Sequence, residues 1–243
     1  MRRGMIKKLF QKPSIQWPMK FQQKLERATD ERLVAFYAKE LPAPETPLSQ
    51  VEFVALDFET TGLNPQKNGI ITIGLVPFNL NRIFLRQAKH WKVRPQEKLD
   101  EDSVIIHGIT HSELIDAPDL GEILGPLLES LAGKIVVVHY RRIEREFLDQ
   151  ALRTRIGEGI EFPVLDTLQI EEDIQQRTSG GLWNKLKGNK PKSLRLAQSR
   201  RRYGLPDYTP HHALTDAIAT GELLQAQIAH HYQADQPISS LWL

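Results

Sequence analysis

Three runs of apolar and β-branched residues follow one another between residues 51 and 93, and they constrain the fold more than any other feature of this chain. The runs are VEFVALDF, IITIGLVPF and RIFLRQAKHWKV, and the turn-rich segment LNPQKNG separates the first two. Runs of this composition and spacing are typical of strands joined in a meander. We therefore predict three antiparallel strands.

Helical signals replace the strand pattern after residue 107. Helices are predicted over DLGEILGPLLESLAG (119–133), RRIEREFLDQALRTR (141–155), KSLRLAQSRRRYG (192–204) and about 211–229, with short strands at KIVVVH (134–139) and FPVLDT (162–167). Three meander strands followed by alternating helix and strand predict an α/β fold, a mixed five-stranded sheet flanked by helices.

The first 47 residues differ from the rest of the chain. One helix is predicted from about Pro18 to Glu40, and the Pro-rich segment LPAPETPLSQ follows it. We expect a basic, partly helical extension with its linker over residues 1–47, the main domain over 48–232 and a C-terminal tail over 233–243.

The absence of cysteine among the 243 residues excludes disulfides, thiol catalysis and cysteine-ligated metals. A metal in this protein would be held by carboxylates or histidines. No run of about 18 apolar residues is present, and the basic start lacks the apolar stretch of a secretory signal. We expect a cytoplasmic protein that does not contact a membrane.

Basic residues are concentrated in two segments although the net charge is only +2. Residues 1–27 hold eight Lys or Arg and one acid, and residues 175–204 hold nine bases and no acid. In the second segment the bases surround Trp183 and Tyr203, a mixture suited to phosphates and bases of nucleic acid. The candidate contacts are Lys185, Lys187, Lys190 and Lys192. The alternative for residues 175–204 is a solvated loop and helix. The alternative for residues 1–27 is a basic tail that only aids solubility.

Two acids interrupt the first predicted strand. Asp57 and Glu59 are two residues apart, so a strand would point both carboxylates to one face. Burying two like charges is costly, and a divalent cation is the simplest compensation because carboxylate oxygens are its preferred ligands. The alternative is that both acids mark a frayed strand end. Against it, Thr60, Thr61 and Gly62 follow directly, which ends the strand and leaves backbone N–H groups free near the acids.

Further acids and a histidine lie at the starts of two predicted helices. Glu144 falls on the first turns of the helix after KIVVVH, and Asp216 falls near the start of the last helix. Four carboxylates from separate elements suit a two-metal site for phosphoryl displacement. His211, on the loop before Asp216, is the candidate general base because histidine titrates near neutrality. The alternative is that His211 and His212 are a solvent-facing pair at a helix start.

These motifs resemble those of the DnaQ-like 3′–5′ exonucleases of the DEDDh type. LDFETTGL (56–63) reads as the first motif of that family, and HHALTDA (211–217) fits its third. SVIIHGIT, with His107, is similar to the stretch that contacts the terminal nucleotide, and LDT (165–167) also resembles a family segment. The resemblance implies a ribonuclease H-like fold, with Thr61, Gly62, Leu63 and His107 binding substrate.

The second motif departs from the family pattern. The aligned stretch is HYRRIEREFL (139–148), and its carboxylate is Glu144 where the family has Asp. The extra methylene shifts the carboxylate by about an ångström unless the helix compensates. Arg141 and Arg142 stand where the family has other residues, and they would either grip a phosphate or pair with Glu144 or Glu146.

We therefore expect a 3′–5′ exonuclease that uses two Mg²⁺ or Mn²⁺ ions, held by Asp57, Glu59, Glu144 and Asp216, with DNA favoured as substrate. A polymerase or other protein partner would bind through the N-terminal extension. The alternative is a catalytically weak binding module for nucleic acid or a polymerase. An oligoribonuclease-like enzyme is less favoured, because that group has Tyr where His211 stands.

Overall fold

The computed structural model describes residues 15–96, 109, 111–178 and 192–243. Its strands are β1 (Phe53–Thr60), β2 (Ile70–Asn79), β3 (Arg82–Ile83), β4 (Lys89–Lys92), β5 (Ile135–Val138) and β6 (Val164–Asp166). Its α-helices are α1 (Trp17–Leu25), α2 (Glu31–Tyr37), α4 (His111–Ile115), α5 (Leu120–Leu131), α6 (Arg142–Ile156), α7 (Thr167–Thr178), α9 (Leu196–Arg202) and α10 (Ala213–His231). Short 3₁₀ helices are η2 (Leu48–Gln50), η3 (Leu85–Gln87) and η4 (Ile238–Ser240).

The six strands form one mixed sheet in the order β3-β2-β1-β5-β6, with β4 also paired to β2. β1 is antiparallel to β2 and parallel to β5, and β5 is parallel to β6. The third meander strand expected over 82–93 is divided into β3 and β4 by η3, and both pieces pair with β2. The expected mixed α/β fold is therefore confirmed, with six strands where five were predicted.

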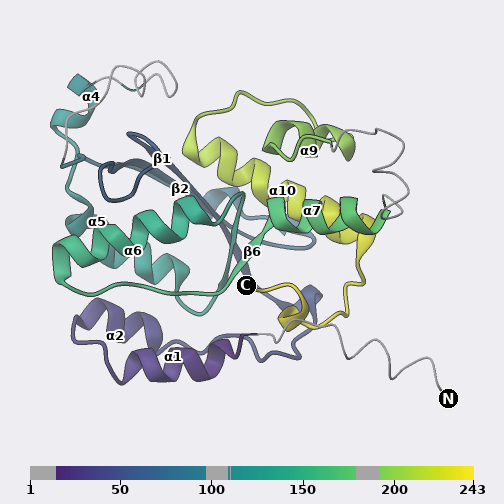
Figure 1. Cartoon of the computed structure of the whole chain (residues 1–243), viewed down its shortest axis with the longest axis horizontal. Helices are drawn as coiled ribbons and strands as arrows, with labels where there is room; N and C mark the ends of the chain where they lie inside the picture. Colours follow the sequence, from purple (N-terminus) through teal and green to yellow (C-terminus); the bar gives the residue numbers. More distant parts are fainter. Residues whose placement is uncertain (1–14, 97–108, 110, 179–191) are drawn as a thin grey trace.

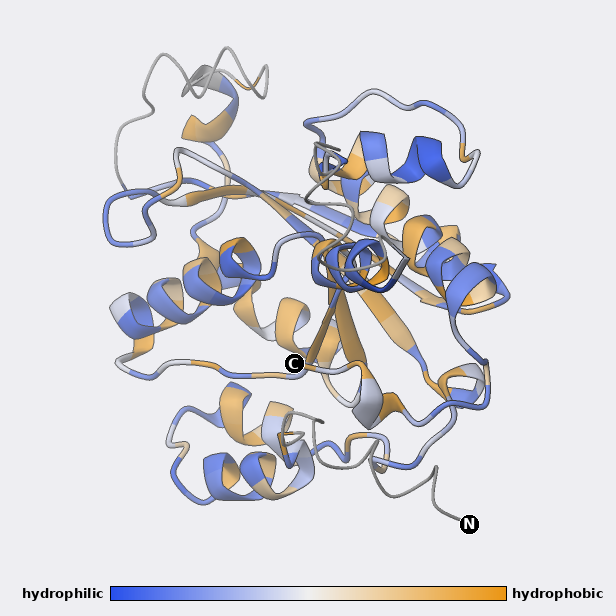
Figure 2. Ribbon diagram, turned by 45° about the vertical axis from the view of Figure 1, so that its right-hand side comes forward, coloured by the Kyte–Doolittle hydropathy of each residue, from blue (hydrophilic) through white to orange (hydrophobic). Residues whose placement is uncertain are grey.

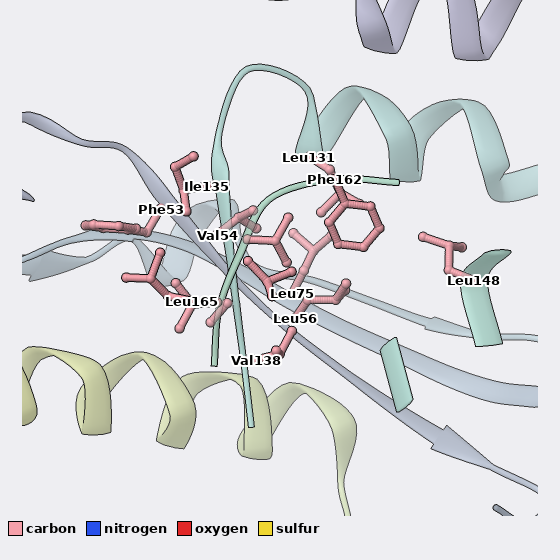
Figure 3. Close-up of a cluster of buried hydrophobic side chains, with 14 of the residues drawn as sticks. Phe53, Val54, Leu56, Leu75, Leu131, Ile135, Val138, Leu148, Phe162 and Leu165 are labelled. Carbon is pink, nitrogen blue, oxygen red and sulfur yellow. The ribbon is translucent and has the colours of Figure 1, made fainter. Parts of the chain in front are cut away.

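Helices cover both faces of this sheet (Figure 1). α5 and α6 lie on one side, and α7, α9 and α10 lie on the other. The strands and the inner sides of the helices are apolar, whereas polar residues face outward (Figure 2). Figure 3 shows the main core, where side chains of β1, β5 and β6 meet Leu131 of α5 and Leu148 of α6. In the described part of the chain, no helix is long and apolar enough to cross a membrane.

The start of α10 approaches the sheet at Gly74 of β2. A Cβ on Gly74 would lie 2.2 Å from the carbonyl carbon of Ala213 and 2.2 Å from the backbone nitrogen of Leu214. Gly74 is also the register partner of Asp57 on β1. Glycine at this position therefore lets the first turn of α10, which carries Asp216, lie directly over the segment that carries Asp57.

The N-terminal helices pack against the rest of the protein. Trp17, Phe21, Phe36 and Tyr37 are buried and belong to the same hydrophobic cluster as the sheet. The guanidinium of Arg145 on α6 lies 5.4 Å from the ring centroid of Trp17. In Figure 1, α1 and α2 lie side by side beneath α5 and α6. The division of the chain at residues 47 and 232 stays a prediction.

Two helical expectations differ from the structure. The single helix expected from Pro18 to Glu40 is interrupted, because the Asp30 side chain accepts a hydrogen bond from the Arg32 N–H at 3.0 Å and caps a second helix. α7 was not predicted. Its sequence TLQIEEDIQQRT buries only four of twelve residues, so it has little of the apolar periodicity by which a helix is recognised.

Replacing Gly74 with Ala tests the close approach of α10. The added Cβ meets backbone atoms, which cannot rotate away, so α10 has to move. We expect a loss of about 1–3 kcal/mol of unfolding free energy, typical of overpacking. A displacement of about 1 Å would also lower any activity that depends on Asp216 by up to ~10²-fold. Thermal unfolding and an activity assay measure the two effects.

Gly221→Ala on the same helix is the matched control. Its Cβ would lie 3.6 Å from the ring of Phe78, an ordinary contact. Alanine is the better helix former by up to ~1 kcal/mol, so we expect equal or higher stability and unchanged activity. Equal behaviour of the two variants would contradict the role assigned to Gly74.

Candidate active site

Asp57 and Glu59 lie on β1 and point to the face of the sheet that α10 covers. Glu59 is buried, with 6% of its surface exposed, and Asp57 is partly buried. Their partners across the strand pair are Gly74 and Thr72. The period of two along a strand thus places both carboxylates on one face, as the sequence analysis expected.

Asp216 approaches this pair from the first turn of α10. Its Oδ2 atom accepts the backbone N–H groups of His211 at 2.8 Å and His212 at 3.1 Å. Its Oδ1 atom accepts the hydroxyl of Tyr208 at 2.8 Å. One ligand atom each from Asp57, Glu59 and Asp216 lies within 4.8 Å of the others. The structure therefore brings these three predicted ligands together.

Glu144 lies on the first turn of α6 and is almost fully buried, at 1% exposure. Its Oε2 atom has no hydrogen-bond partner among the described residues. Glu144 is not part of the group whose ligand atoms lie within 4.8 Å of one another. Burial raises its pKa well above the usual range, and the charges of Asp166 and Glu59 act in the same direction.

The acids repel one another. Burial is the main cause that raises the pKa of Asp57 well above its usual range, and the charges of Glu144 and Asp216 come next. Burial also raises the pKa of Asp216, against the opposing effect of the Tyr208 hydroxyl. A hard divalent cation fits the group of Asp57, Glu59 and Asp216, because it takes carboxylate oxygens as ligands.

The two histidines of the third motif have different environments. His211 lies on the exposed loop before α10 with a φ of 67°, a left-handed conformation that its backbone hydrogen bond to Asp216 supports. His212 is the N-cap of α10, where its Nδ1 accepts the N–H of Thr215 at 3.4 Å. Its ring centroid lies 4.5 Å from that of His90 on β4. His212 thus has a structural role, whereas the role of His211 as base stays a prediction.

The second motif begins with a strained turn. Tyr140 has a φ of 85° and is 41% exposed. The backbone N–H groups of Tyr140 and Arg141 donate to the two carboxylate oxygens of Asp166, at 2.9 and 3.1 Å. Asp166, at the end of β6, therefore fixes the start of α6, where Glu144 lies. The LDT segment (165–167) carries no local signal of this role, because the contacts join residues 25 and 26 positions apart.

The arginines of the second motif are paired within the chain. Arg141 Nη1 lies 3.1 Å from Asp166, and Arg142 Nε lies 2.9 Å from Glu146. The pairing of Arg142 with Glu146 is one of the alternatives considered above. Among the described residues, neither arginine forms an ion pair with Glu144.

The predicted substrate-binding residues of the β1–β2 loop adjoin the acids. Thr61 is buried, and its Oγ1 accepts the N–H of Gly69 at 3.0 Å. Gly62 lies against the side chain of Asn68, and Leu63 is 84% exposed. His107, Lys185, Lys187 and Lys190 lie outside the described residues. Lys192 is described and exposed.

The arginines of the basic segment 175–204 largely serve packing. Arg200 is 3% exposed and pairs with Glu222 at 2.7 Å. Arg202 pairs with buried Glu171 at 2.9 Å, and Arg201 pairs with Asp207 at 2.8 Å. Arg200 thus ties α9 to α10, and Arg202 ties it to α7. Arg201 pairs with the segment that follows α9. The role of the basic segment in binding nucleic acid stays a prediction.

A mixed sheet that gathers acids beside the carboxyl end of β1 and at the starts of two helices defines a ribonuclease H-like class of fold. The structure of exonuclease X in complex with 5′-overhanging duplex DNA is similar, with a TM-score of 0.56 and 20% identity over 77% of this chain and 98% of that one. The nuclease domain of 3′hExo, a DEDDh family member bound to rAMP, has a TM-score of 0.59 and 15% identity over 74% of this chain and 92% of that one. The expected fold is confirmed.

The family model for exonucleases (RNase_T) matches residues 54–224, and the chain belongs to this family. The DNA polymerase III subunit epsilon of Treponema pallidum is 28% identical over 181 residues, 74% of this chain and 78% of that protein. The PolC-type DNA polymerase III of Thermotoga petrophila is 30% identical over 171 residues, which make up 70% of this chain but 11% of that polymerase. The resemblance to DnaQ-like exonucleases is confirmed.

Replacing Asp57 with Asn tests the electrostatic cost of the acid cluster. The folded pKa of Asp57 lies above the usual 3.8, so unfolding free energy falls as the pH rises from 3.8 through the folded pKa. At neutral pH without metal, the variant should therefore be more stable than wild type. Thermal unfolding in EDTA measures this difference.

Divalent cations should reverse that order. Mg²⁺ or Mn²⁺ at about 100 times its dissociation constant should stabilise wild type by ~2.7 kcal/mol and Asp57→Asn by much less. Glu129→Gln, which removes an exposed acid of α5, is the control and should behave as wild type. A wild-type protein that gains no stability from either ion would contradict the metal site.

Proposed function

We propose that this protein is a metal-dependent 3′–5′ exonuclease that releases nucleoside monophosphates from nucleic acid, with single-stranded DNA favoured. The observation that carries the proposal is the group of Asp57, Glu59 and Asp216, whose ligand atoms lie within 4.8 Å of one another beside the loop of His211. The relatives support DNA as substrate, since they include a polymerase subunit epsilon and an exonuclease solved with DNA.

Asp57, Glu59, Asp216 and Glu144 would hold two Mg²⁺ or Mn²⁺ ions, as the chemistry of the donor set suggests. Divalent cations bound there supply activation of water and stabilisation of charge on the leaving oxygen. His211 takes the proton from the attacking water as general base. The hydrogen bond from its backbone to Asp216 keeps the base and a ligand in fixed relation. Exposed Leu63 offers an apolar contact to the terminal nucleotide.

A second candidate is a binding module with the exonuclease fold and weak turnover. The observation that favours it is that Glu144, which replaces the family Asp, lies outside the 4.8 Å group of ligand atoms. In this case the site would bind nucleic acid without efficient hydrolysis.

A protein partner such as a polymerase would bind through the N-terminal extension. In that region Ile15, Met19 and Val34 are exposed apolar residues, at 40%, 61% and 36%. Their neighbours Trp17, Phe21 and Phe36 are buried, so α1 and α2 have an inner face on the core and an outer face with apolar residues. The cytoplasmic location also stays a prediction.

Digestion of a 5′-labelled single-stranded DNA tests the proposed activity. We expect a ladder of products shortened from the 3′ end in Mg²⁺ or Mn²⁺. Stepwise removal of nucleotides from that end leaves the 5′ label on every shortened product, so the whole series is visible. No ladder should form in EDTA or with Asp57→Asn. RNA and a mismatched duplex, run in parallel, rank the substrates. Binding of all substrates without cleavage would instead support the binding module.

Replacing Glu144 with Asp separates the two candidates. If Glu144 is a fitted ligand, the shorter side chain withdraws the carboxylate by about an ångström, and we expect equal or lower turnover. A steep rise in turnover would show that Glu144 had weakened an ancestral site. Glu146→Asp, on the same helix but paired with Arg142 at the surface, is the control and should not change turnover.

Replacing His211 with Asn tests the proposed base. Loss of a general base typically costs 10²–10⁴-fold in rate, so we expect ~10²–10⁴-fold lower kcat. Stabilisation by Mn²⁺ should persist, since the acids are intact. His212→Asn is the matched control, because Asn is a preferred N-cap residue and should preserve the start of α10. Equal losses in both variants would contradict the assignment of the base to His211.

A further inference from the structure

Tyr208 contacts the acid cluster although no motif of the sequence includes it. It lies eight residues before Asp216, on the segment between α9 and α10, and it is partly buried. Its hydroxyl donates to Asp216 Oδ1 at 2.8 Å. A tyrosine hydroxyl is protonated at neutral pH, so it is the donor in this contact.

The ring of Tyr208 is held by a buried guanidinium. Arg200 lies with its Cζ atom 5.1 Å from the ring centroid. Arg200 also donates to the carbonyl of Ala219 on α10 at 2.8 Å and to the carbonyl of Pro206 at 3.2 Å, and it pairs with Glu222 at 2.7 Å. The segment that carries Tyr208 is therefore fixed to the same helix that carries Asp216.

The hydrogen bonds of Asp216 leave one oxygen for a cation. An ionised carboxylate has about two acceptor positions on each oxygen. The N–H groups of His211 and His212 fill both positions of Oδ2, whereas Tyr208 fills one position of Oδ1. Oδ1 thus has the remaining acceptor capacity of this carboxylate, beside the hydrogen bond from Tyr208.

We propose that Tyr208 is a positioning residue of the metal site, which orients Oδ1 of Asp216 toward Asp57 and Glu59. Because Oδ2 of the same carboxylate holds the backbone of His211, Tyr208 also keeps the ligand and the proposed base in one rigid unit. This inference rests on the proposed function, since it assigns a role within that site.

Tyr208→Phe removes only the hydroxyl and keeps the ring over Arg200. Partners of metal ligands typically change metal affinity by 10–100-fold. We expect at least ~10-fold weaker Mn²⁺ binding, measured directly by electron paramagnetic resonance of free Mn²⁺. In the nuclease assay, the Mn²⁺ concentration for half-maximal kcat should rise by the same factor, with KM for DNA unchanged and kcat restored at high Mn²⁺.

Tyr203→Phe is the matched control. Its hydroxyl donates at 2.8 Å to Glu171, a buried carboxylate outside the cluster. We expect this variant to lose stability in EDTA as much as Tyr208→Phe or more, but to bind Mn²⁺ as wild type does. A loss that reflects only folding would appear equally in both variants.

The outcomes separate the inference from the proposed function. Wild-type Mn²⁺ affinity in Tyr208→Phe, with wild-type protein active, would overturn the positioning role alone. Equal weakening in Tyr208→Phe and Tyr203→Phe would also overturn it. A wild-type protein that neither binds Mn²⁺ nor cleaves nucleic acid would overturn both the proposed function and the role of Tyr208.

Discussion

The approach of α10 to β2 at Gly74 is the constraint on which the site depends. Asp57 is the register partner of Gly74, and Gly74 lies against the backbone of Ala213, the first residue of α10. Asp216 lies in the first turn of the same helix. One backbone contact therefore sets how far two carboxylates from distant parts of the sequence lie from each other. A side chain at position 74 would hold the start of α10 farther from β2.

The sequence could predict those parts of the fold and site that follow from local patterns. The alternation along VALDFET predicts that Asp57 and Glu59 share a face, and the structure places them so. Helix signals also predict the elements that carry Glu144 and Asp216. The positions of Asp166 and Tyr208 could not be predicted in this way, because their roles arise from hydrogen bonds to residues 8 to 26 positions away.

The same limit applies to the ends of the chain. Composition predicts a basic N-terminal extension, but it does not predict that four aromatic residues of α1 and α2 join the hydrophobic cluster of the sheet. The Pro-rich linker also bonds to the C-terminal tail, with the N–H of Leu48 donating to Gln236 and that of Ile238 donating to Thr46, at 3.0 and 2.9 Å. Contacts of this kind depend on the folded arrangement and leave no periodic signal in either segment.

The edges of the sheet have a consequence for how the protein meets other chains. At one edge, η3 interrupts the outer strand, which leaves two short pieces, and Lys89 and Lys92 are exposed on β4. At the other edge, the backbone of Leu243 bonds to Val164 of β6. Short, charged or covered edges resist the addition of a foreign strand, which is a common route to aggregation. Within the described residues, neither edge of the sheet therefore offers a long, uncovered strand for another chain to pair with.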